Sequence, residues 1–160
     1  MKIGVVADTH SLDIPRQMLN DFKKVDMIIH AGDFCTTKEL EVFQKITKVK
    51  AVVGNMDDSH LRDILPQRQI FKCEDFMIGL FHSYGPPKDT LNNAIREFRS
   101  SKVDIVIFGH SHIPCNETIN KVLYFNPGSP NDMVLAPYCS YGIIDIKDRQ
   151  IFPKIVKVKM

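Results

Sequence analysis

The first third of the chain alternates short apolar runs with longer amphipathic segments. The runs 1–7, 25–31 and 49–53 are short and apolar and predict buried strands. Between them, apolar residues at helical spacing predict helices over 15–24 and 36–47, the second with Thr36 or Thr37 as its cap. Because parallel strands need crossover connections, this order predicts a parallel sheet with covering helices.

The rest of the chain is richer in predicted strands. A polar stretch after residue 55 ends at Leu65-Pro66, where any short helix within it must stop. The pattern then predicts a hairpin from 69–73 and 76–81, a helix over 88–99 and a buried strand over 103–108. Four more strands are expected, joined in pairs by tight turns, at 116–119, 122–125, 140–146 and 150–156.

Length and composition fit a single domain over residues 1–160, with 44% hydrophobic and 25% charged residues. The net charge of +2 gives no sign of a nucleic-acid surface. No apolar run approaches the roughly 18 residues of a membrane span, and the N-terminus lacks a signal-peptide pattern. We therefore expect a cytoplasmic protein that does not associate with membranes. Homo-oligomerisation is compatible with the sequence.

Residues with metal-ligand chemistry follow five of the apolar runs. They are Asp8, His10, Asp33, Asn55, His82, His110 and His112. Because the loops at the carboxyl ends of strands converge in an open α/β sheet, we expect these side chains to meet. Three glycines directly precede members of this set and allow close backbone approach, namely Gly32, Gly54 and Gly109.

The donor types in this set suit divalent cations. Two cations about 3.5–4 Å apart repel each other, so a shared site needs an anionic bridge such as a carboxylate. Carboxylate, amide oxygen and neutral imidazole suit manganese, iron, nickel or zinc, and the set contains no thiolate of a structural zinc site. Taken singly, each residue is more often a helix cap, a turn residue or a hydrogen-bonded histidine. Capping does not explain seven such residues at five strand ends.

The order and approximate spacing of these motifs resemble those of the calcineurin-like metallophosphoesterases. The matching motifs are Asp8-x-His10, Gly32-Asp33, Gly54-Asn55, His82 and Gly109-His110-x-His112. The short length and the segment Asn126-Pro127-Gly128-Ser129 resemble the small bacterial and archaeal phosphodiesterase branch of that family. The resemblance implies an α/β fold in which two mixed sheets form a β-sandwich flanked by helices (αββα).

The resemblance also implies a role for each residue. Asp8, His10, Asp33 and His112 would bind one metal ion, and Asp33, Asn55, His82 and His110 the other, with Asp33 as the bridge. Asn55, His82 and His110 would also be the catalytic residues. The implied cofactors are two divalent metal ions, with manganese favoured over nickel, iron or zinc. The implied reaction is hydrolysis of a small phosphodiester or nucleotide by attack of a metal-bound hydroxide.

Two positions depart from the family pattern. Many members have a histidine after the Gly-Asn motif that protonates the leaving group, and Met56 cannot do this. Nearby substitutes for that acid are Asp57, Asp58 and His60. Ser83 stands where glycine is usual and fits only if its φ stays negative.

Two other functions remain open. One is a non-catalytic scaffold, like the retromer subunit that shares this fold, and the other is a phosphomonoesterase. The complete set of seven ligand positions argues against a scaffold, whereas Met56 argues for one. We interpret His30, which lies inside a predicted strand, as a buried hydrogen-bonded histidine. The segment 126–129 is either a simple turn or a support for the metal ligands.

Overall fold

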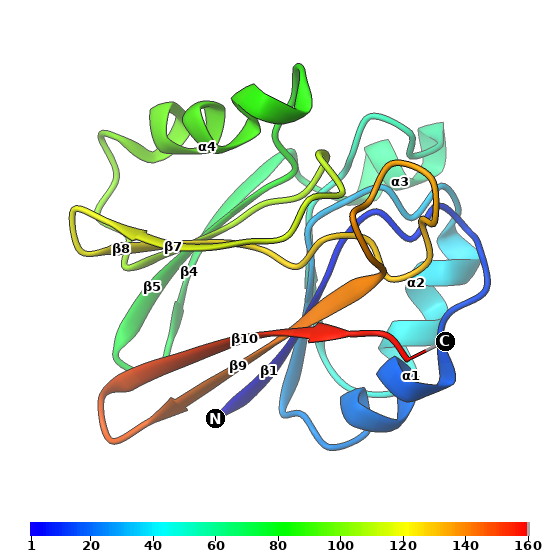
Figure 1. Ribbon diagram of the computed structural model, residues 1–160, viewed down its shortest axis with the longest axis horizontal. Coiled ribbons are helices and arrows are strands. Elements are labelled where there is room, and N and C mark those ends of the chain that lie inside the picture. The colour runs from blue at the N-terminus through cyan, green and yellow to red at the C-terminus, as the bar shows by residue number, and fades with distance from the viewer. Residues whose placement is uncertain (160) are drawn as a thin grey trace.

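The computed structural model describes residues 1–159 and contains two five-stranded sheets that pack face to face (Figure 1). The first sheet has the order β10-β9-β1-β2-β3, and the second has the order β4-β5-β6-β8-β7. The strands of the first sheet are β1 (Lys2–Val6), β2 (Met27–His30), β3 (Val49–Ala51), β9 (Ser140–Lys147) and β10 (Gln150–Lys157). Those of the second are β4 (Arg68–Cys73), β5 (Phe76–Phe81), β6 (Ile105–Ile107), β7 (Cys115–Ile119) and β8 (Val122–Asn126).

Helices cover the outer faces of both sheets (Figure 1). Three of them pack on the first sheet, namely α1 (Arg16–Phe22), α2 (Thr37–Gln44) and α3 (Ser59–Ile64). On the second sheet lies α4 (Thr90–Phe98), which follows the 3-10 turn η1 (Pro87–Asp89). No helix within residues 1–159 is both long and apolar enough to cross a membrane.

The core has two layers on the first sheet because successive side chains of a strand point to opposite faces. In β1, Ile3 and Val5 face the second sheet, whereas Val6 faces the helices. Both faces of this central strand are therefore buried, which explains its unbroken apolar run. The parallel pairing of β1 with β2 and of β2 with β3 confirms the predicted βαβαβ arrangement, and the two mixed sheets confirm the αββα fold class.

Some predicted elements are longer than the observed ones at the ends that approach the site. The strand expected over 49–53 ends at Ala51, because the Val53 N–H donates to the Pro66 carbonyl instead of a neighbouring strand. The strand expected over 103–108 is limited to Ile105–Ile107. Thr36 is the N-cap of α2, but its hydroxyl bonds the Ser11 hydroxyl and not the helix backbone. These ends adapt to the loops that carry the donor side chains.

Candidate metal centre

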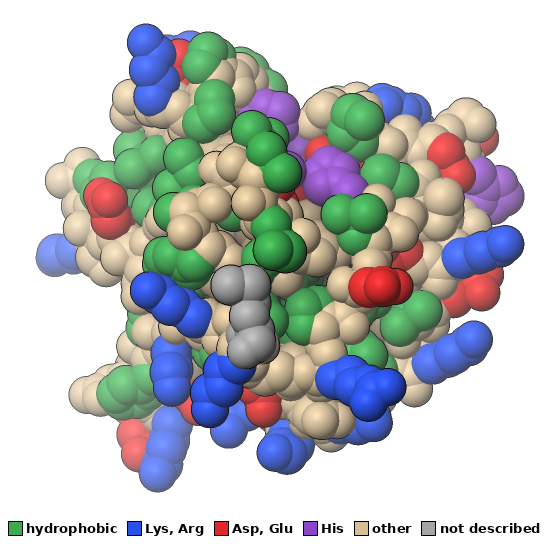
Figure 2. All heavy atoms as spheres, turned by 45° about the vertical axis from the view of Figure 1, so that its right-hand side comes forward, with side chains coloured by type: hydrophobic (Ala, Val, Ile, Leu, Met, Phe, Trp, Pro, Cys, Tyr) green, Lys and Arg blue, Asp and Glu red, His purple; other side chains and the backbone are tan. Residues whose placement is uncertain are grey.

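Loops after β1, β2, β3, β5 and β6 bring the seven predicted donor residues to one edge of the sandwich. Three of them, Asp8, Asp33 and His82, are buried. The imidazoles of His10 and His112 are half-buried. In Figure 2, histidine side chains lie in a hollow of the surface with hydrophobic side chains beside them, while most lysines and arginines lie lower in that view. The donors thus form a partly open site.

A first group of donors forms around two imidazoles. The Nε2 atoms of His10 and His112 lie 3.1 Å apart. The Asp8 Oδ1 atom lies 3.7 Å from the Nε2 atom of His112, and the Asp33 Oδ2 atom lies 3.7 Å from that of His10. One ligand atom each from Asp8, His10 and His112 lies within 4.8 Å of the other two, which is a spacing that a single metal ion can bridge.

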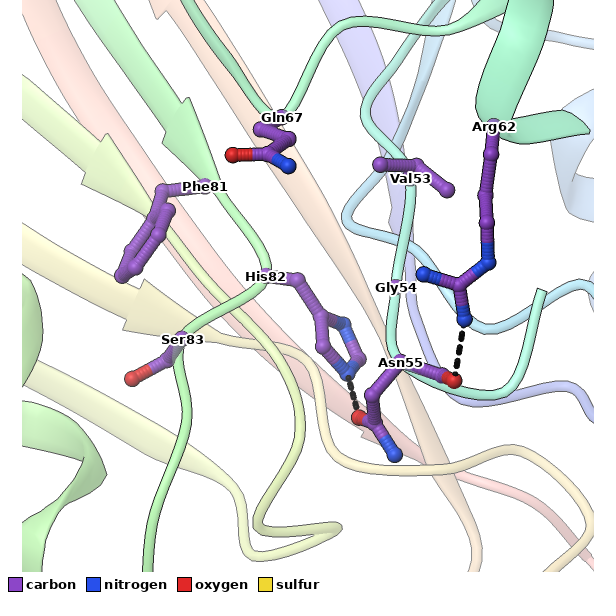
Figure 3. A pocket seen from close by; sticks show the side chains of 8 residues that line it. All are labelled: Val53, Gly54, Asn55, Arg62, Gln67, Phe81, His82 and Ser83. Atoms are coloured by element: carbon purple, nitrogen blue, oxygen red, sulfur yellow. Dashed lines mark hydrogen bonds between the residues drawn. The ribbon is translucent and has the colours of Figure 1, made fainter.

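A second group of donors lies on the other side of Asp33. The same Asp33 Oδ2 atom is 3.4 Å from the Nε2 atom of His82. The side-chain oxygen of Asn55 lies 3.0 Å from this nitrogen (Figure 3). The same oxygen lies 2.9 Å from the Nδ1 atom of His110. One carboxylate oxygen of Asp33 therefore faces both groups of donors.

The imidazoles of the second group are held by backbone carbonyls behind them. The Nδ1 atom of His82 lies 2.7 Å from the Ala31 carbonyl, and the Nε2 atom of His110 lies 3.0 Å from the Gly85 carbonyl. Because a carbonyl only accepts hydrogen bonds, each of these nitrogens carries the N–H. In the neutral ring the other nitrogen then presents its lone pair to the site, as in metal-binding histidines.

Electrostatics also favour positive charge between the two carboxylates. Burial raises the pKa of Asp8 to about 6, although His82 and His112 oppose the shift. Burial would lower the pKa of His82, but its hydrogen bond to Asp33 and the charges of Asp8 and Asp33 outweigh burial and raise this pKa to about 9. A donor set of lone pairs and carboxylates that stabilises positive charge fits divalent cations.

Backbone strain is concentrated at the donor residues. Five of them have positive φ, namely Asp8 (+56°), His10 (+52°), Asp33 (+62°), His110 (+71°) and His112 (+56°). Ser83 also has a φ of +78°, so the expectation of a negative φ there is wrong. Its buried hydroxyl donates to the Thr90 carbonyl, which ties this strained turn to α4. Such strain costs on the order of 1–3 kcal/mol per residue and tends to cluster at functional sites.

The absence of a side chain at Gly54 is required by Asp33. A Cβ atom at Gly54 would lie 2.1 Å from Oδ1 of Asp33. Gly32 has a φ of +97°, which favours glycine as well. These contacts confirm the expectation that glycines permit close approach of the loops.

The buried carboxylate of Asp57 joins two of these loops. Its Oδ2 atom accepts hydrogen bonds from the backbone N–H groups of Asp33 and Gly54, and its Oδ1 atom accepts one from Cys35. All three donors belong to the loops that carry Asp33 and Asn55. Asp57 therefore holds the site together and is not free to protonate a leaving group. The prediction that Asp57 replaces the family's acid is wrong.

The two other substitutes for the missing acid are both on or next to α3. Asp58 is the N-cap of α3 and accepts a hydrogen bond from the Leu61 N–H. His60 is exposed in the first turn of the same helix. Met56 itself is 57% exposed, and its backbone N–H donates to Oδ1 of Asp33. Of the three substitutes, only the side chain of His60 is uncommitted within the described residues.

Arg62 fixes the backbone next to Asn55. Its guanidinium donates to the carbonyls of Asn55 and Asp57, and Figure 3 shows it reaching from α3 to the Asn55 loop. A hollow of about 170 Å³ lies beside Asn55 and His82, and Arg62 is the only cationic side chain among residues 1–159 that lines it. Its guanidinium is already bound to these two backbone carbonyls. The hydrogen bonds set the direction in which the Asn55 side chain leaves the loop.

Asp132 supports the site and was not predicted from the sequence. Its Oδ2 atom accepts a hydrogen bond from Nδ1 of His112, and its Oδ1 atom accepts from the Val134 and Leu135 N–H groups. Burial alone would raise the pKa of Asp132, but these hydrogen bonds lower it to about 2. Asp132 lies in an irregular loop without periodicity. The only sequence feature near Asp132 that pointed to the site was the motif at residues 126–129.

We expect Asp132→Asn to weaken metal binding about 10- to 100-fold. The amide oxygen would stay on the Val134 and Leu135 N–H groups, so the amide nitrogen would face Nδ1 of His112. This donor favours the tautomer with the proton on Nε2, which is the nitrogen that faces the site. Titration of metal-free protein with Mn²⁺ tests the expectation, with Asp148→Asn at an exposed turn as the control. Equal affinity in both variants would show that Asp132 does not orient His112.

The segment 126–131 supports the strand-end loops. The Ser129 hydroxyl donates to the Asp8 carbonyl, and the Asn126 amide donates to the Gly109 carbonyl. Asn131 donates to the Thr9 carbonyl. Of the two interpretations of this segment, the structure thus favours a support for the ligand loops over a simple turn.

His30 is buried and satisfied, as predicted. Its Nδ1 atom accepts the Gly32 N–H, and its Nε2 atom bonds the Thr9 hydroxyl. The ring stacks on Phe34 with 3.5 Å between centroids. Burial lowers its pKa well below the ordinary value, so the ring stays neutral. His30 supports the loop after β2 and takes no part in the donor groups.

Glu39 makes protein stability depend on pH. Its Oε2 atom accepts from the Ser11 N–H, whereas Oε1 is buried without a hydrogen-bond partner in the described chain. Burial raises its pKa from 4.5 to about 7, although hydrogen bonds oppose the shift. The folded state thus holds this proton more tightly than the unfolded state. The resulting stabilisation is complete below pH 4.5 and is lost as pH rises through about 7.

We therefore expect Glu39→Gln, which cannot lose a proton, to gain stability relative to the natural chain as pH rises. The difference in unfolding free energy should grow by roughly 1–2 kcal/mol between pH 5 and pH 8, discounted for partial hydration. Urea unfolding of both metal-free proteins at several pH values measures it. Parallel pH curves would contradict the expectation.

Comparisons with known proteins agree with this geometry. The sequence model of the calcineurin-like phosphoesterase superfamily domain matches residues 1–149, so the chain belongs to that family. A probable metallophosphoesterase of Methanocaldococcus jannaschii is 36% identical over 93% of this chain and 78% of that protein. A phosphodiesterase of the same archaeon is 31% identical over 94% of this chain and 96% of its own length.

Solved structures show the same fold. The structure of an archaeal phosphodiesterase superposes with a TM-score of 0.78 at 25% identity, covering 98% of this chain and all of the other. Vps29 of Entamoeba histolytica in complex with Zn²⁺ superposes with a TM-score of 0.79 at 22% identity, over 99% of this chain and all of the other. The chain is thus a member of a phosphoesterase family with a group of candidate metal ligands.

Proposed function

We propose that this protein is a phosphodiesterase that uses two divalent metal ions, with manganese favoured over nickel, iron and zinc. One ion would be bound by Asp8, His10, Asp33 and His112. The other would be bound by Asp33, Asn55, His82 and His110. The substrate would be a small phosphodiester.

The observation that carries this proposal is the position of Asp33. Its Oδ2 atom lies 3.7 Å from Nε2 of His10 and 3.4 Å from Nε2 of His82, so one oxygen faces a donor group on each side. A carboxylate between two donor groups is what two neighbouring cations require as an anionic bridge. The relatives' names, which include a phosphodiesterase covered almost completely by this chain, support the same function.

The chain's own residues would bind and orient the phosphate. Cations held by the two donor groups would neutralise charge on the phosphoryl oxygens in the transition state. The side-chain oxygen of Asn55 faces His82 and His110. Its amide nitrogen points away from His82 (Figure 3). This nitrogen would donate a hydrogen bond to a phosphoryl oxygen. The Arg62 contact to the Asn55 carbonyl would keep the amide in that orientation.

The charge around the site favours a diester over a monoester. A phosphomonoester carries close to two negative charges at neutral pH, whereas a diester carries one. Arg62 is the one lysine or arginine among the described residues that line the hollows beside the donors, and backbone carbonyls occupy its guanidinium. Beyond the two metal ions, the second charge of a monoester would find no free cationic side chain there.

Hydrolysis of bis(p-nitrophenyl) phosphate and of p-nitrophenyl phosphate, with and without Mn²⁺, tests the proposal. We expect Mn²⁺-dependent turnover with the diester preferred. Preference for the monoester would favour a phosphomonoesterase. A protein that binds Mn²⁺ but hydrolyses neither ester would favour a scaffold, as the exposed Met56 in place of a proton donor and the likeness to the Vps29 fold would then suggest.

A further inference from the structure

A second hollow opens beside the first donor group, with a volume of about 570 Å³. Its lining residues are His10, Leu12, His112, Asn131, Asp132, Met133, Val134 and Leu135. The four apolar members are unusually exposed, from 54% for Leu12 to 88% for Val134. We call this feature the apolar hollow. Figure 2 shows hydrophobic side chains directly beside the histidines.

The apolar hollow and the candidate metal centre share part of their lining. His10 and His112 belong to both, so a group that fills the hollow lies next to the atoms that would hold the metal ion. The volume lies within the range of about 300–1,000 Å³ typical of small-molecule pockets. A substrate with its phosphate at the donors would therefore extend one of its ester groups into the hollow.

The wall of the hollow is fixed to the site. Asp132 accepts hydrogen bonds from the N–H groups of Val134 and Leu135 and from His112. Asn131 donates to the Thr9 carbonyl, between Asp8 and His10. The wall therefore has a set position relative to the donors, as a specificity subsite requires.

The chemistry of the lining indicates what would bind. Among its described residues none is a lysine or arginine, and the one charged side chain beside the imidazoles, Asp132, is anionic. A second phosphate or a carboxylate would find no counter-ion there and would be repelled by Asp132. An uncharged apolar group would instead cover exposed side chains that otherwise contact water.

We infer that the apolar hollow binds an uncharged aryl or alkyl ester group of the substrate, so that the substrate class is a phosphodiester with one apolar substituent. This inference rests on the proposed phosphodiesterase function. It assigns Leu12, Met133 and Leu135 to substrate selection, and it excludes substrates with a second anionic group at this position.

Two diesters that share the same leaving group, p-nitrophenolate, test the inference. They are methyl p-nitrophenyl phosphate and phenyl p-nitrophenyl phosphate. We expect kcat/KM of the Mn²⁺-loaded protein to be at least tenfold higher for the phenyl ester, because apolar pockets discriminate on this scale. Met133→Ser combined with Leu135→Ser should reduce this ratio toward one, through a loss of kcat/KM for the phenyl ester. Phe152→Ser, an exposed apolar position on β10, is the matched control and should keep the ratio.

A binding measurement gives a second readout. Diphenyl phosphate should shift the methyl NMR signals of Met133 and Leu135, and dimethyl phosphate should not. Equal kcat/KM for both esters, or an equal loss for both in the double variant, would overturn the inference alone. A dimer in the natural chain that the double variant disrupts, with an unchanged ester ratio, would assign the surface to self-association and also overturn it. Failure of the metal-loaded protein to hydrolyse either ester would overturn the proposed function and this inference together.

Discussion

Asp33→Asn is expected to remove almost all of the proposed phosphodiesterase activity, by about three orders of magnitude or more. The substitution keeps the size of the side chain and leaves an amide oxygen to accept the Met56 N–H, so the loop can fold as before. It removes the negative charge that faces both donor groups. Loss of several kcal/mol of charge stabilisation in the transition state lowers the rate about a thousandfold, since each 1.36 kcal/mol changes the rate tenfold.

Metal analysis and kinetics on bis(p-nitrophenyl) phosphate measure this effect. We expect two metal ions per natural chain and fewer than two per Asp33→Asn chain. Asp145→Asn is the matched control, because that carboxylate forms an exposed ion pair with Lys2 at 3.8 Å that contributes little to stability. Full activity of Asp33→Asn, with an unchanged metal content, would refute Asp33 as the bridging ligand.

Asp57→Ala is expected to destabilise the protein by about 3–5 kcal/mol. The substitution leaves the N–H groups of Asp33, Gly54 and Cys35 without their acceptor in a region where Asp57 is 3% exposed. Unsatisfied buried polar groups cost about 1–3 kcal/mol each, and part of this cost is relieved when water enters. Urea unfolding of the metal-free protein measures the loss.

The neighbouring substitution Asp58→Ala provides the comparison for Asp57→Ala. It removes one N-cap hydrogen bond of α3 and should cost about 0.5–2 kcal/mol. Both variants lose one carboxylate from the same segment, so net charge and chain position are matched. A similar loss in the two variants would mean that the Asp57 hydrogen bonds do not hold the loops together.

The meeting of the seven donor residues could be predicted because each follows an apolar run. Asp8, Asp33 and Asn55 come after parallel strands of one sheet, and periodicity alone identifies those strands. His82 and His110 follow runs that belong to the second sheet. That the two sheets face each other came from the family resemblance, because no local pattern encodes the contact between them.

The supporting residues could not be predicted in the same way. The role of Asp57 depends on three backbone N–H groups, which have no sequence signature. Asp132 reaches His112 across twenty positions of irregular chain. Ser83 has a positive φ in a turn that its hydroxyl ties to Thr90 on α4, a contact that no local pattern of the sequence encodes. The positions of these supporting residues therefore depend on long-range hydrogen bonds, which local sequence propensity does not predict.

The donor residues are divided between the two sheets, with Asp8, His10, Asp33 and Asn55 on loops of the first and His82, His110 and His112 on loops of the second. An ion bound by both sets would cross-link the loops of the two sheets. Ligand binding to the folded state alone adds about 2.7 kcal/mol of stability at a hundredfold excess over Kd. Metal supply would then set how firmly the two halves of the molecule hold together as well as how fast it works.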